Sequence, residues 1–298
     1  MINRKLSLVI CTFNRADFIG EALRSLANQS LSPDDFEIII INNNCTDDTE
    51  QICLSFIAKH PSLDVIYVIE KNQGLSFARN RGIEESKYEI ITYIDDDAYA
   101  SPSFLSIITD FFKENPKTVG VGGKVIPRYE IAEPKWMNSY LDGFVAKLDM
   151  GHKQMRFSKF QYPVGCNMTY TKSILKKVGG FNNKLKWRAD DKYIGIKVRE
   201  VSDEVYYLPN LVVEHTIDAY RTSDENFKKF CLKFGNEEAI RVRDINLFSY
   251  LNKGLEFLIK LVGSFFLMLG FYLKGQFAKG KYTLMYRWWA TLGFFTTK

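Results

Sequence analysis

Cysteine and histidine are scarce in this sequence of 298 residues, which has five cysteines and three histidines. The cysteines are odd in number, lie far apart and include no Cys-x-x-Cys pair. A disulfide framework and a cysteine zinc site both require paired or closely spaced cysteines. The pattern therefore argues against both and favours the reduced thiols of an intracellular protein.

A long apolar stretch near the N-terminus is also lacking, and the chain enters a strand-like run at Leu6. A secretory signal peptide would need such a stretch, so we expect the folded part to stay in the cytoplasm. Internal repeats and low-complexity linkers are missing too. The length suits one large α/β domain with additions, or two small domains.

Excess positive charge is missing from most of the chain. The net charge is +5, but residues 245–298 carry seven Lys or Arg and one acid, Glu256, which gives this tail +6 and residues 1–244 about −1. A protein that binds nucleic acid usually spreads Lys and Arg over its folded domain. We therefore expect no nucleic-acid partner.

Short apolar, β-branched runs alternate with segments of helical periodicity through the first hundred residues. The predicted strands are Leu6–Cys11, Phe36–Ile41, Asp64–Ile69 and Glu89–Ile94. The predicted helices are Asp17–Gln29, Asp47–Lys59 and Leu75–Ser86. Strands joined through helices predict an α/β fold with a Rossmann-like, mostly parallel sheet flanked by helices.

The next hundred residues give a more varied pattern. We expect a helix that begins at Ser101-Pro102, with Ser as the N-cap and Pro in the first position. The other predicted elements are a strand at Val119–Ile126, an irregular aromatic cover over the site at Tyr129–Tyr162, a helix at Asp191–Val201, and strands at Glu204–Leu208 and Leu211–Glu214, with His215 at the end of the last.

Polar residues follow the predicted parallel strands, at the sheet edge where such folds bind ligands. They are Thr12, Asn14 and Arg15 after the first strand, Asn42-Asn43-Asn44 after the second, and Asp95-Asp96-Asp97 after the fourth. Three adjacent carboxylates repel one another, and a hard divalent ion such as Mg²⁺ or Mn²⁺ would relieve that repulsion. Taken alone, the triplet fits a solvated turn that caps the next helix equally well.

Seven segments of the sequence favour a cation site over a solvated turn at the triplet. They read VICTFNR, INNNCTDDT, GLSFARNRG, YIDDDAYASP, VGCNMTY, VGGF and ADDKYIGIKVRE. In this order and spacing, over about Leu6 to His215, the chain resembles the family 2 inverting glycosyltransferases, which have a GT-A fold. The resemblance implies a catalytic domain over residues 1–220, with a nucleotide-binding half (1–100) and an acceptor half (101–220). A helical, membrane-associating region over residues 221–298 would follow.

The resemblance also implies roles for the nucleotide-binding residues. Thr12, Asn14, Arg15, Asn42 and Asn44 would border the nucleotide, and Arg79 would lie near the base and phosphates. Asn42 stands where the family usually has an Asp that reads the base. This departure leaves the base open, although an amide can pair with a uracil edge. Arg79 could instead be an ordinary surface arginine of a helix.

The resemblance also implies metal-binding and catalytic roles for the acidic residues. Asp97 would be the direct ligand of Mn²⁺ or Mg²⁺, His215 a further ligand, and Asp95 and Asp96 would serve the ribose hydroxyls and the metal's waters. Asp191 would be the general base, with Asp190 beside it. A lone His is more often structural, and an acidic pair at a helix start also complements the helix dipole.

The tail and the aromatic residues leave alternatives open. Trp136 and Trp187 could stack on sugar rings or be core residues. The segment Tyr250–Leu273, followed by Lys, Arg, Trp and Tyr, is typical of a helical hairpin at the inner face of the cell membrane. The same helices could instead pack on the catalytic domain or form a homodimer interface.

We therefore expect a glycosyltransferase that moves a sugar from a UDP-sugar to a glycan or a lipid-linked glycan, as in cell-surface polysaccharide assembly. The alternative is a non-catalytic, membrane-associated subunit that binds nucleotide-sugars in a polysaccharide assembly complex. A nucleotidyltransferase would carry a glycine- and lysine-rich phosphate loop after its first strand, which CTFNR lacks.

Overall fold

The computed structural model describes residues 5–158, 161–185 and 189–296. These residues divide into two compact units, called unit 1 and unit 2 below. Unit 1 consists of the described residues of Met1–Ile126, Leu148–Lys186 and Asp190–His215, and unit 2 of those of Pro127–Lys147, Trp187–Ala189 and Thr216–Lys298. Residues 127–147 thus belong to unit 2, whereas the domain boundary at residue 220 stays a prediction.

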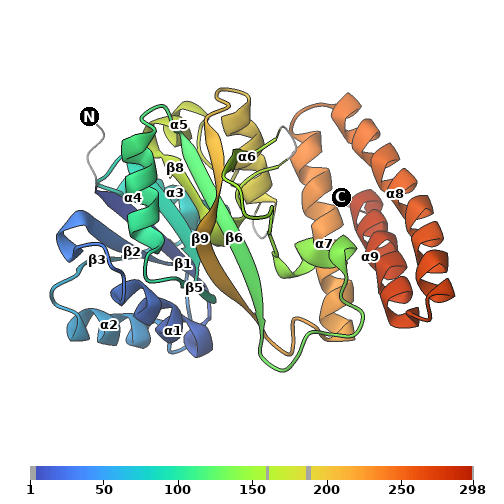
Figure 1. The fold of residues 1–298 in the computed structure, drawn as a ribbon, viewed down its shortest axis with the longest axis horizontal. Helices are drawn as coiled ribbons and strands as arrows, with labels where there is room; N and C mark the ends of the chain where they lie inside the picture. Colours follow the sequence, from blue (N-terminus) through green and yellow to red (C-terminus); the bar gives the residue numbers. More distant parts are fainter. Residues whose placement is uncertain (1–4, 159–160, 186–188, 297–298) are drawn as a thin grey trace. The chain divides into compact units, whose positions relative to one another are not determined.

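Unit 1 is built around one sheet with helices on both faces (Figure 1). The strands are β1 (Leu6–Thr12), β2 (Phe36–Asn42), β3 (Asp64–Ile69), β4 (Ile90–Asp95), β5 (Ala98–Ala100), β6 (Gly120–Tyr129), β7 (Met155–Arg156), β8 (Met168–Thr171) and β9 (Val205–Ile217). The α-helices are α1 (Ala16–Ala27), α2 (Thr49–Lys59), α3 (Leu75–Glu85), α4 (Phe104–Glu114), α5 (Lys172–Lys177) and α6 (Asp190–Arg199), with short 3-10 turns η1 (Pro33–Asp35) and η3 (Gly165–Asn167).

The strand order is β3-β2-β1-β4-β8-β6-β9-β5, with β7 paired to β9. β3, β2, β1 and β4 are parallel, which confirms the parallel sheet predicted for the first hundred residues. The pairs β4–β8, β6–β8 and β5–β9 are antiparallel, so the complete sheet is mixed.

The continuous apolar runs follow from helices on both faces of the parallel strands. All seven residues of β2 are buried. Ile38 and Ile40 pack in one core with α1, α2 and α4, whereas Ile39 and Ile41 pack in a second core with α3, α5 and α6. A strand covered on both faces needs apolar side chains at every position, which is why its sequence does not alternate.

Two local predictions in the second half were wrong. The fourth helix begins at Phe104, not at Ser101-Pro102. The N–H of Ser101 donates to the carbonyl of Val212 in β9 at 3.3 Å, so Ser101 continues the β5–β9 ladder and Pro102 lies in the turn before the helix.

The two strands predicted at 204–208 and 211–214 are one strand, β9, which runs through Pro209. A proline is tolerated inside a strand where its nitrogen faces no ladder partner. His215 therefore lies inside β9, two residues before its end at Ile217, and not after the strand.

Unit 2 contains the 3-10 segment η2 (Ser139–Val145) and the helices α7 (Asp224–Arg243), α8 (Leu247–Leu273) and α9 (Phe277–Thr296). Trp136 is buried in its aromatic core. Its ring stacks on Tyr282, with ring centroids 4.7 Å apart, and meets the edges of Phe144 and Phe227. These contacts favour the core interpretation of Trp136, while Trp187 lies outside the described residues.

The predicted C-terminal helical extension is present, since α8 and α9 form a hairpin joined at Gly275. α9 packs against α7 and α8. Within the described residues, α8 is long and apolar enough to cross a membrane, and 17% of its most apolar part is buried. Such a helix also occurs in soluble proteins, so this finding by itself is weak.

Candidate active site

The strand ends of unit 1 bring the predicted polar residues to one edge of the sheet. Thr12 and Asn42 are register partners at the ends of β1 and β2, and Asp95 at the end of β4 is the register partner of Cys11. The parallel pairing thus places the residues that follow these strands side by side.

His215 reaches the acidic triplet through a strand pair that the sequence did not predict. β5 begins at Ala98, directly after the triplet, and Ala98 is the register partner of His215 in β9. Nε2 of His215 consequently lies 3.1 Å from Oδ1 of Asp97, and both side chains are buried. Ligand atoms of Asp95, Asp97 and His215 all lie within 4.8 Å of one another.

This set fits a divalent cation. Bonds of about 2.1 Å to one octahedral ion place adjacent ligand atoms about 3.0 Å apart, close to the separation between Asp97 and His215. Oδ2 of Asp97 pairs with Arg15, which also lies 3.4 Å from Oδ1 of Asp96. The oxygen of Asp97 that faces His215 is therefore a different one from the oxygen that pairs with Arg15.

Burial and the neighbouring carboxylates both act on the pKa of Asp96. Burial is the largest cause that raises its pKa, to about 7, and the charge of Asp97 raises it further. Arg15 acts in the opposite direction. A second positive charge beside the triplet would favour the ionised form of Asp96, as expected for a cation site.

Arg79 joins the triplet to the acidic pair. It projects from α3, its side chain is 3% exposed, and its Nη2 lies 3.1 Å from Oδ1 of Asp95. Its Nη1 pairs with Asp190 at the start of α6, and its guanidinium lies near the rings of Tyr93 and Phe181. Arg79 is thus a buried cation shared between two carboxylates, not an ordinary surface arginine.

Asp191 is the more accessible member of the acidic pair. Its carboxylate accepts hydrogen bonds from two backbone N–H groups, that of Gly165 at 3.2 Å and that of its neighbour Lys192 at 2.7 Å. Burial and the charge of Asp190 raise its pKa, and Arg79 partly offsets them. Among the described residues no ion pair to Asp191 forms, whereas Asp190 is paired with Arg79.

The asparagines near the first two strand ends mainly build loops. Asn14 and Asn44 have left-handed backbones, with φ of 51° and 64°. The side chain of Asn14 accepts from the N–H of Thr46 at 2.7 Å, and that of Asn44 donates to the carbonyl of Lys71 at 2.5 Å.

Both polar atoms of the Asn42 side chain are engaged. Its amide nitrogen donates to the hydroxyl of Tyr67 at 2.6 Å, and its oxygen accepts from the N–H of Cys45 at 2.7 Å. The carboxylate of Asp47 accepts hydrogen bonds from the N–H groups of Ala16 and Thr49, the first residues of α1 and α2, and so connects the starts of these two helices.

No role was predicted for two further residues of the site, Gly165 and Asn43. The N–H of Gly165 positions Asp191, and a Cβ at Gly165 would lie 2.6 Å from Nη2 of Arg79, so a larger residue there would have to displace the guanidinium. Asn43 holds the loop before α3, because its side chain bonds the backbone of Glu70, Asn72 and Gly74. The VGCNMTY and INNNCTDDT segments contained both residues, but spacing alone did not assign these roles.

Unit 1 therefore brings Arg15, Arg79, Asp95, Asp96, Asp97, Asp190, Asp191 and His215 together through direct contacts or shared partners. The side-chain bonds of Asn14, Asn42 and Asn44 hold the neighbouring loops. The described part of the irregular segment predicted as a cover is divided between unit 1 and unit 2, and its role stays a prediction.

Known proteins share this sequence pattern. The sequence profile described as Glycosyl transferase family 2 matches residues 7–179. A glucosyl-dolichyl phosphate glucuronosyltransferase of Haloferax volcanii is 26% identical over 230 residues, which is 73% of this chain and 71% of that relative. A poly(ribitol-phosphate) beta-glucosyltransferase of Bacillus spizizenii is 28% identical over 242 residues, which is 75% of this chain but only 35% of that longer relative.

Solved structures share the fold. The mannosyltransferase PcManGT from Pyrobaculum calidifontis, in complex with GDP-Man and Mn²⁺, has a TM-score of 0.62 and 16% identity over 82% of this chain and 66% of that chain. S. aureus TarS 1-349 in complex with UDP has a TM-score of 0.57 and 18% identity, over 81% and 71% of the two chains. These likenesses confirm the predicted GT-A fold. Since the family profile matches more than half of the sequence, the chain belongs to glycosyl transferase family 2 and is a glycosyltransferase.

Proposed function

We propose that this site transfers a sugar from a UDP-sugar to a hydroxyl group of a glycan or lipid-linked glycan, with inversion at the anomeric carbon. The observation that carries the proposal is the position of Arg79, which connects Asp95 of the acidic triplet to Asp190, next to Asp191. One buried cation thereby connects the residues proposed to hold the donor's diphosphate with the residues proposed to act on the acceptor.

Asp97 and His215, with Asp95 beside them, are the proposed ligands of Mn²⁺ or Mg²⁺. When bound, the metal ion supplies positive charge for the leaving diphosphate. Arg79 and Arg15 add fixed positive charge on the protein side of the same position. Asp96, together with Asp95, is proposed to accept hydrogen bonds from the ribose hydroxyls or from the metal's waters.

Asp191 is proposed as the general base that accepts the proton of the acceptor hydroxyl. Two backbone N–H groups fix the orientation of its carboxylate. Its raised pKa brings its basicity closer to the working pH of an enzyme. With a base on the face opposite the leaving group, displacement takes place in one step and inverts the anomeric carbon.

The nucleotide is proposed to lie against Thr12, Asn14, Arg15, Asn42 and Asn44. Because both polar atoms of the Asn42 side chain already have protein partners, we expect the backbone of these loops to contribute to base recognition. Two of the similar solved structures are complexes with UDP and with GDP-Man, respectively, so UDP-sugars and GDP-sugars are the donors to compare.

The acceptor and location follow from the relatives and the tail. The named relatives act on a glucosyl-dolichyl phosphate and on poly(ribitol-phosphate), which supports a cell-envelope acceptor for this chain. The exposed apolar side chains of α8, which include Leu258, Val262 and Phe265, support peripheral association with the inner face of the cell membrane. A homodimer through the same face is the alternative, and sedimentation of the protein without lipid separates the two.

The test is a screen of UDP- and GDP-sugars with Mn²⁺ or Mg²⁺, in which donor binding is measured by thermal shift and transfer by product formation. We expect Asp191→Asn to lose transfer but to keep metal-dependent donor binding. Asp110→Asn, an exposed residue of α4, is the matched control. Transfer that is unchanged in Asp191→Asn contradicts the base assignment, and donor binding without transfer in the wild type would favour the non-catalytic subunit.

A further inference from the structure

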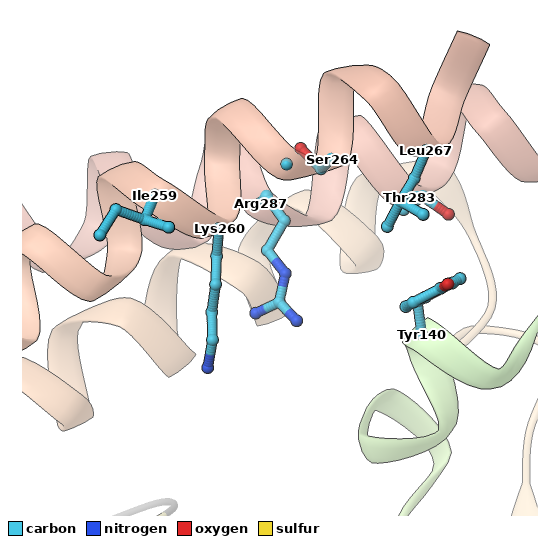
Figure 2. A pocket seen from close by; sticks show the side chains of 8 residues that line it. Tyr140, Ile259, Lys260, Ser264, Leu267, Thr283 and Arg287 are labelled. Atoms are coloured by element: carbon cyan, nitrogen blue, oxygen red, sulfur yellow. The ribbon is translucent and has the colours of Figure 1, made fainter. Parts of the chain in front are cut away.

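A cavity of about 450 Å³ lies in unit 2, between α8, α9 and η2. α8 contributes Ile259, Lys260 and Leu267, and α9 contributes Arg287. The ring of Tyr140 from η2 faces them across the opening, and the side chains of Lys260 and Arg287 extend into the same space (Figure 2). The cavity thus combines an apolar wall with two cations.

The hydroxyls of Ser264 and Thr283 in the wall already have protein partners. The hydroxyl of Ser264 donates to the carbonyl of Leu261 at 2.6 Å, and that of Thr283 donates to the carbonyl of Lys279 at 2.8 Å. Thr283 also accepts from the side chain of Asn138. The groups left to recognise a polar ligand are therefore the two cations, Lys260 and Arg287, and the hydroxyl of Tyr140.

The two cations are only partly neutralised. Lys260 pairs with Glu256, but that single acid also pairs with Lys253. Arg287 lies 5.0 Å from the ring of Tyr286, and no ion pair to Arg287 forms in the part of the chain that the structure describes. An anion beside Lys260 and Arg287 would therefore meet net positive charge.

We propose that this cavity binds the phosphate group of a membrane lipid together with the first carbons of its apolar chain. Lys260 and Arg287 would hold the phosphate, for which a guanidinium offers paired N–H donors. Ile259, Leu267 and the ring of Tyr140 would cover the adjoining carbons. The proposal deepens the membrane association proposed above and rests on it for the source of the lipid.

The apolar face of α8 indicates that the bound phosphate group belongs to a lipid and is not free phosphate. Its exposed side chains recur at intervals of three or four residues, which places them on one face of the helix. Six of the exposed apolar residues follow this spacing: Leu251, Leu255, Leu258, Val262, Phe265 and Leu269. Ile259, which is 62% exposed, lies next to this stripe and also lines the cavity. A chain that leaves the cavity would meet apolar surface at once.

Two glycines of α8 give a matched pair of variants. A Cβ at Gly263 or at Gly270 would meet no atom within 4 Å, so both positions accept a larger residue. Gly263 lines the cavity and Gly270 does not. Because leucine favours a helix more than glycine does, neither variant should unfold α8. Gly263→Leu fills the cavity, and Gly270→Leu is its control.

The direct test measures binding of farnesyl phosphate to the full chain by calorimetry, with farnesol and inorganic phosphate as separate probes. We expect farnesyl phosphate to bind at least about tenfold more tightly than either probe, since charge-assisted hydrogen bonds and apolar burial each add to affinity. Gly263→Leu, and Lys260→Gln with Arg287→Gln, should each weaken binding about tenfold or more. Gly270→Leu, and Lys274→Gln with Lys281→Gln, should leave it unchanged.

Vesicles separate this site from general membrane association. We expect flotation with phosphatidylcholine vesicles that contain polyprenyl phosphate to exceed flotation with vesicles of equal charge that contain phosphatidylglycerol, and Gly263→Leu to remove the difference. Equal flotation with both overturns the cavity proposal and leaves membrane association standing. Failure to float with either overturns membrane association. Farnesyl phosphate binding that Gly263→Leu does not weaken overturns the cavity proposal in every case.

Discussion

Replacement of Arg79 with methionine should strongly destabilise unit 1. The side chains of Arg79 and Asp190 are each 3% exposed, and they pair with one another. Methionine keeps much of the apolar volume of the stem but leaves the Asp190 carboxylate buried without its cation. Removal of one partner from a buried ion pair costs about 3–5 kcal/mol, a large share of the roughly 5–15 kcal/mol that stabilises a typical protein.

Replacement of Asp190, the partner of Arg79, in addition tests this reasoning. In Arg79→Met with Asp190→Asn the uncompensated charge is gone, so we expect the double variant to regain at least about half of the loss. A buried pair in unit 2 supplies the control, because Nε of Arg241 lies 3.0 Å from Oε1 of the buried Glu238. Arg241→Met should destabilise unit 2 by the same mechanism but to a smaller extent, because Lys253 lies 3.7 Å from Oε2 of Glu238 and still faces that carboxylate.

Hydrogen exchange read by mass spectrometry can follow the two units separately. The opening free energy of amides in β1 and β4 reports on unit 1, and that of amides in α7 reports on unit 2. The measurement is made without donor or metal, so that ligand binding does not contribute. The reasoning is refuted if Arg79→Met lowers the free energy of opening of unit 1 by less than about 1 kcal/mol, or if the double variant is no more stable than the single one.

Three further variants address the chemistry of the site. Asp190→Asn removes a charge that raises the pKa of Asp191. Since the base acts when deprotonated, the acidic limb of the pH profile of kcat/KM should move to lower pH. An acidic limb that moves to higher pH or stays in place would contradict the assignment of Asp191 as the base. Asp97→Ala should abolish stimulation of donor binding by Mn²⁺ or Mg²⁺ in a thermal-shift titration, and persistent stimulation would place the metal elsewhere. Gly165→Ala places a Cβ against Arg79. It should lower the free energy of unfolding, measured in denaturant, by about 1–3 kcal/mol and remove most of the transfer activity. Wild-type stability and activity would mean that Arg79 has room to move.

The parallel half of the sheet could be predicted because its signal is local. Each run, such as Phe36–Asn42, is apolar throughout since helices cover both faces. The errors came where a local signal competed with a distant partner. Ser101-Pro102 is a good helix start in isolation, but Ser101 pairs with β9 across the sheet. Pro209 suggests a break, yet β9 continues through it.

The site was predictable in its residues but not in its connections. The strand ends and the family resemblance pointed to Arg79, to the triplet and to Asp190-Asp191. The bond between Arg79 and Asp190 joins residues 111 positions apart, and no periodicity or spacing encodes such a contact. His215 reaches Asp97 only because the short strand β5 pairs with β9, and a three-residue strand leaves almost no trace in the sequence.

The two oxygens of Asp97 explain how the triplet can be both a structural ion-pair site and a cation site. Oδ2 pairs with Arg15, whereas Oδ1 faces His215. Arg15 also acts against the burial that raises the pKa of Asp96. The arginine therefore stabilises the crowded carboxylates from one side, and the proposed metal ion would lie on the other side, with His215 and Asp95. Since these two positions differ, binding of a divalent cation at Asp97 does not require Arg15 to leave.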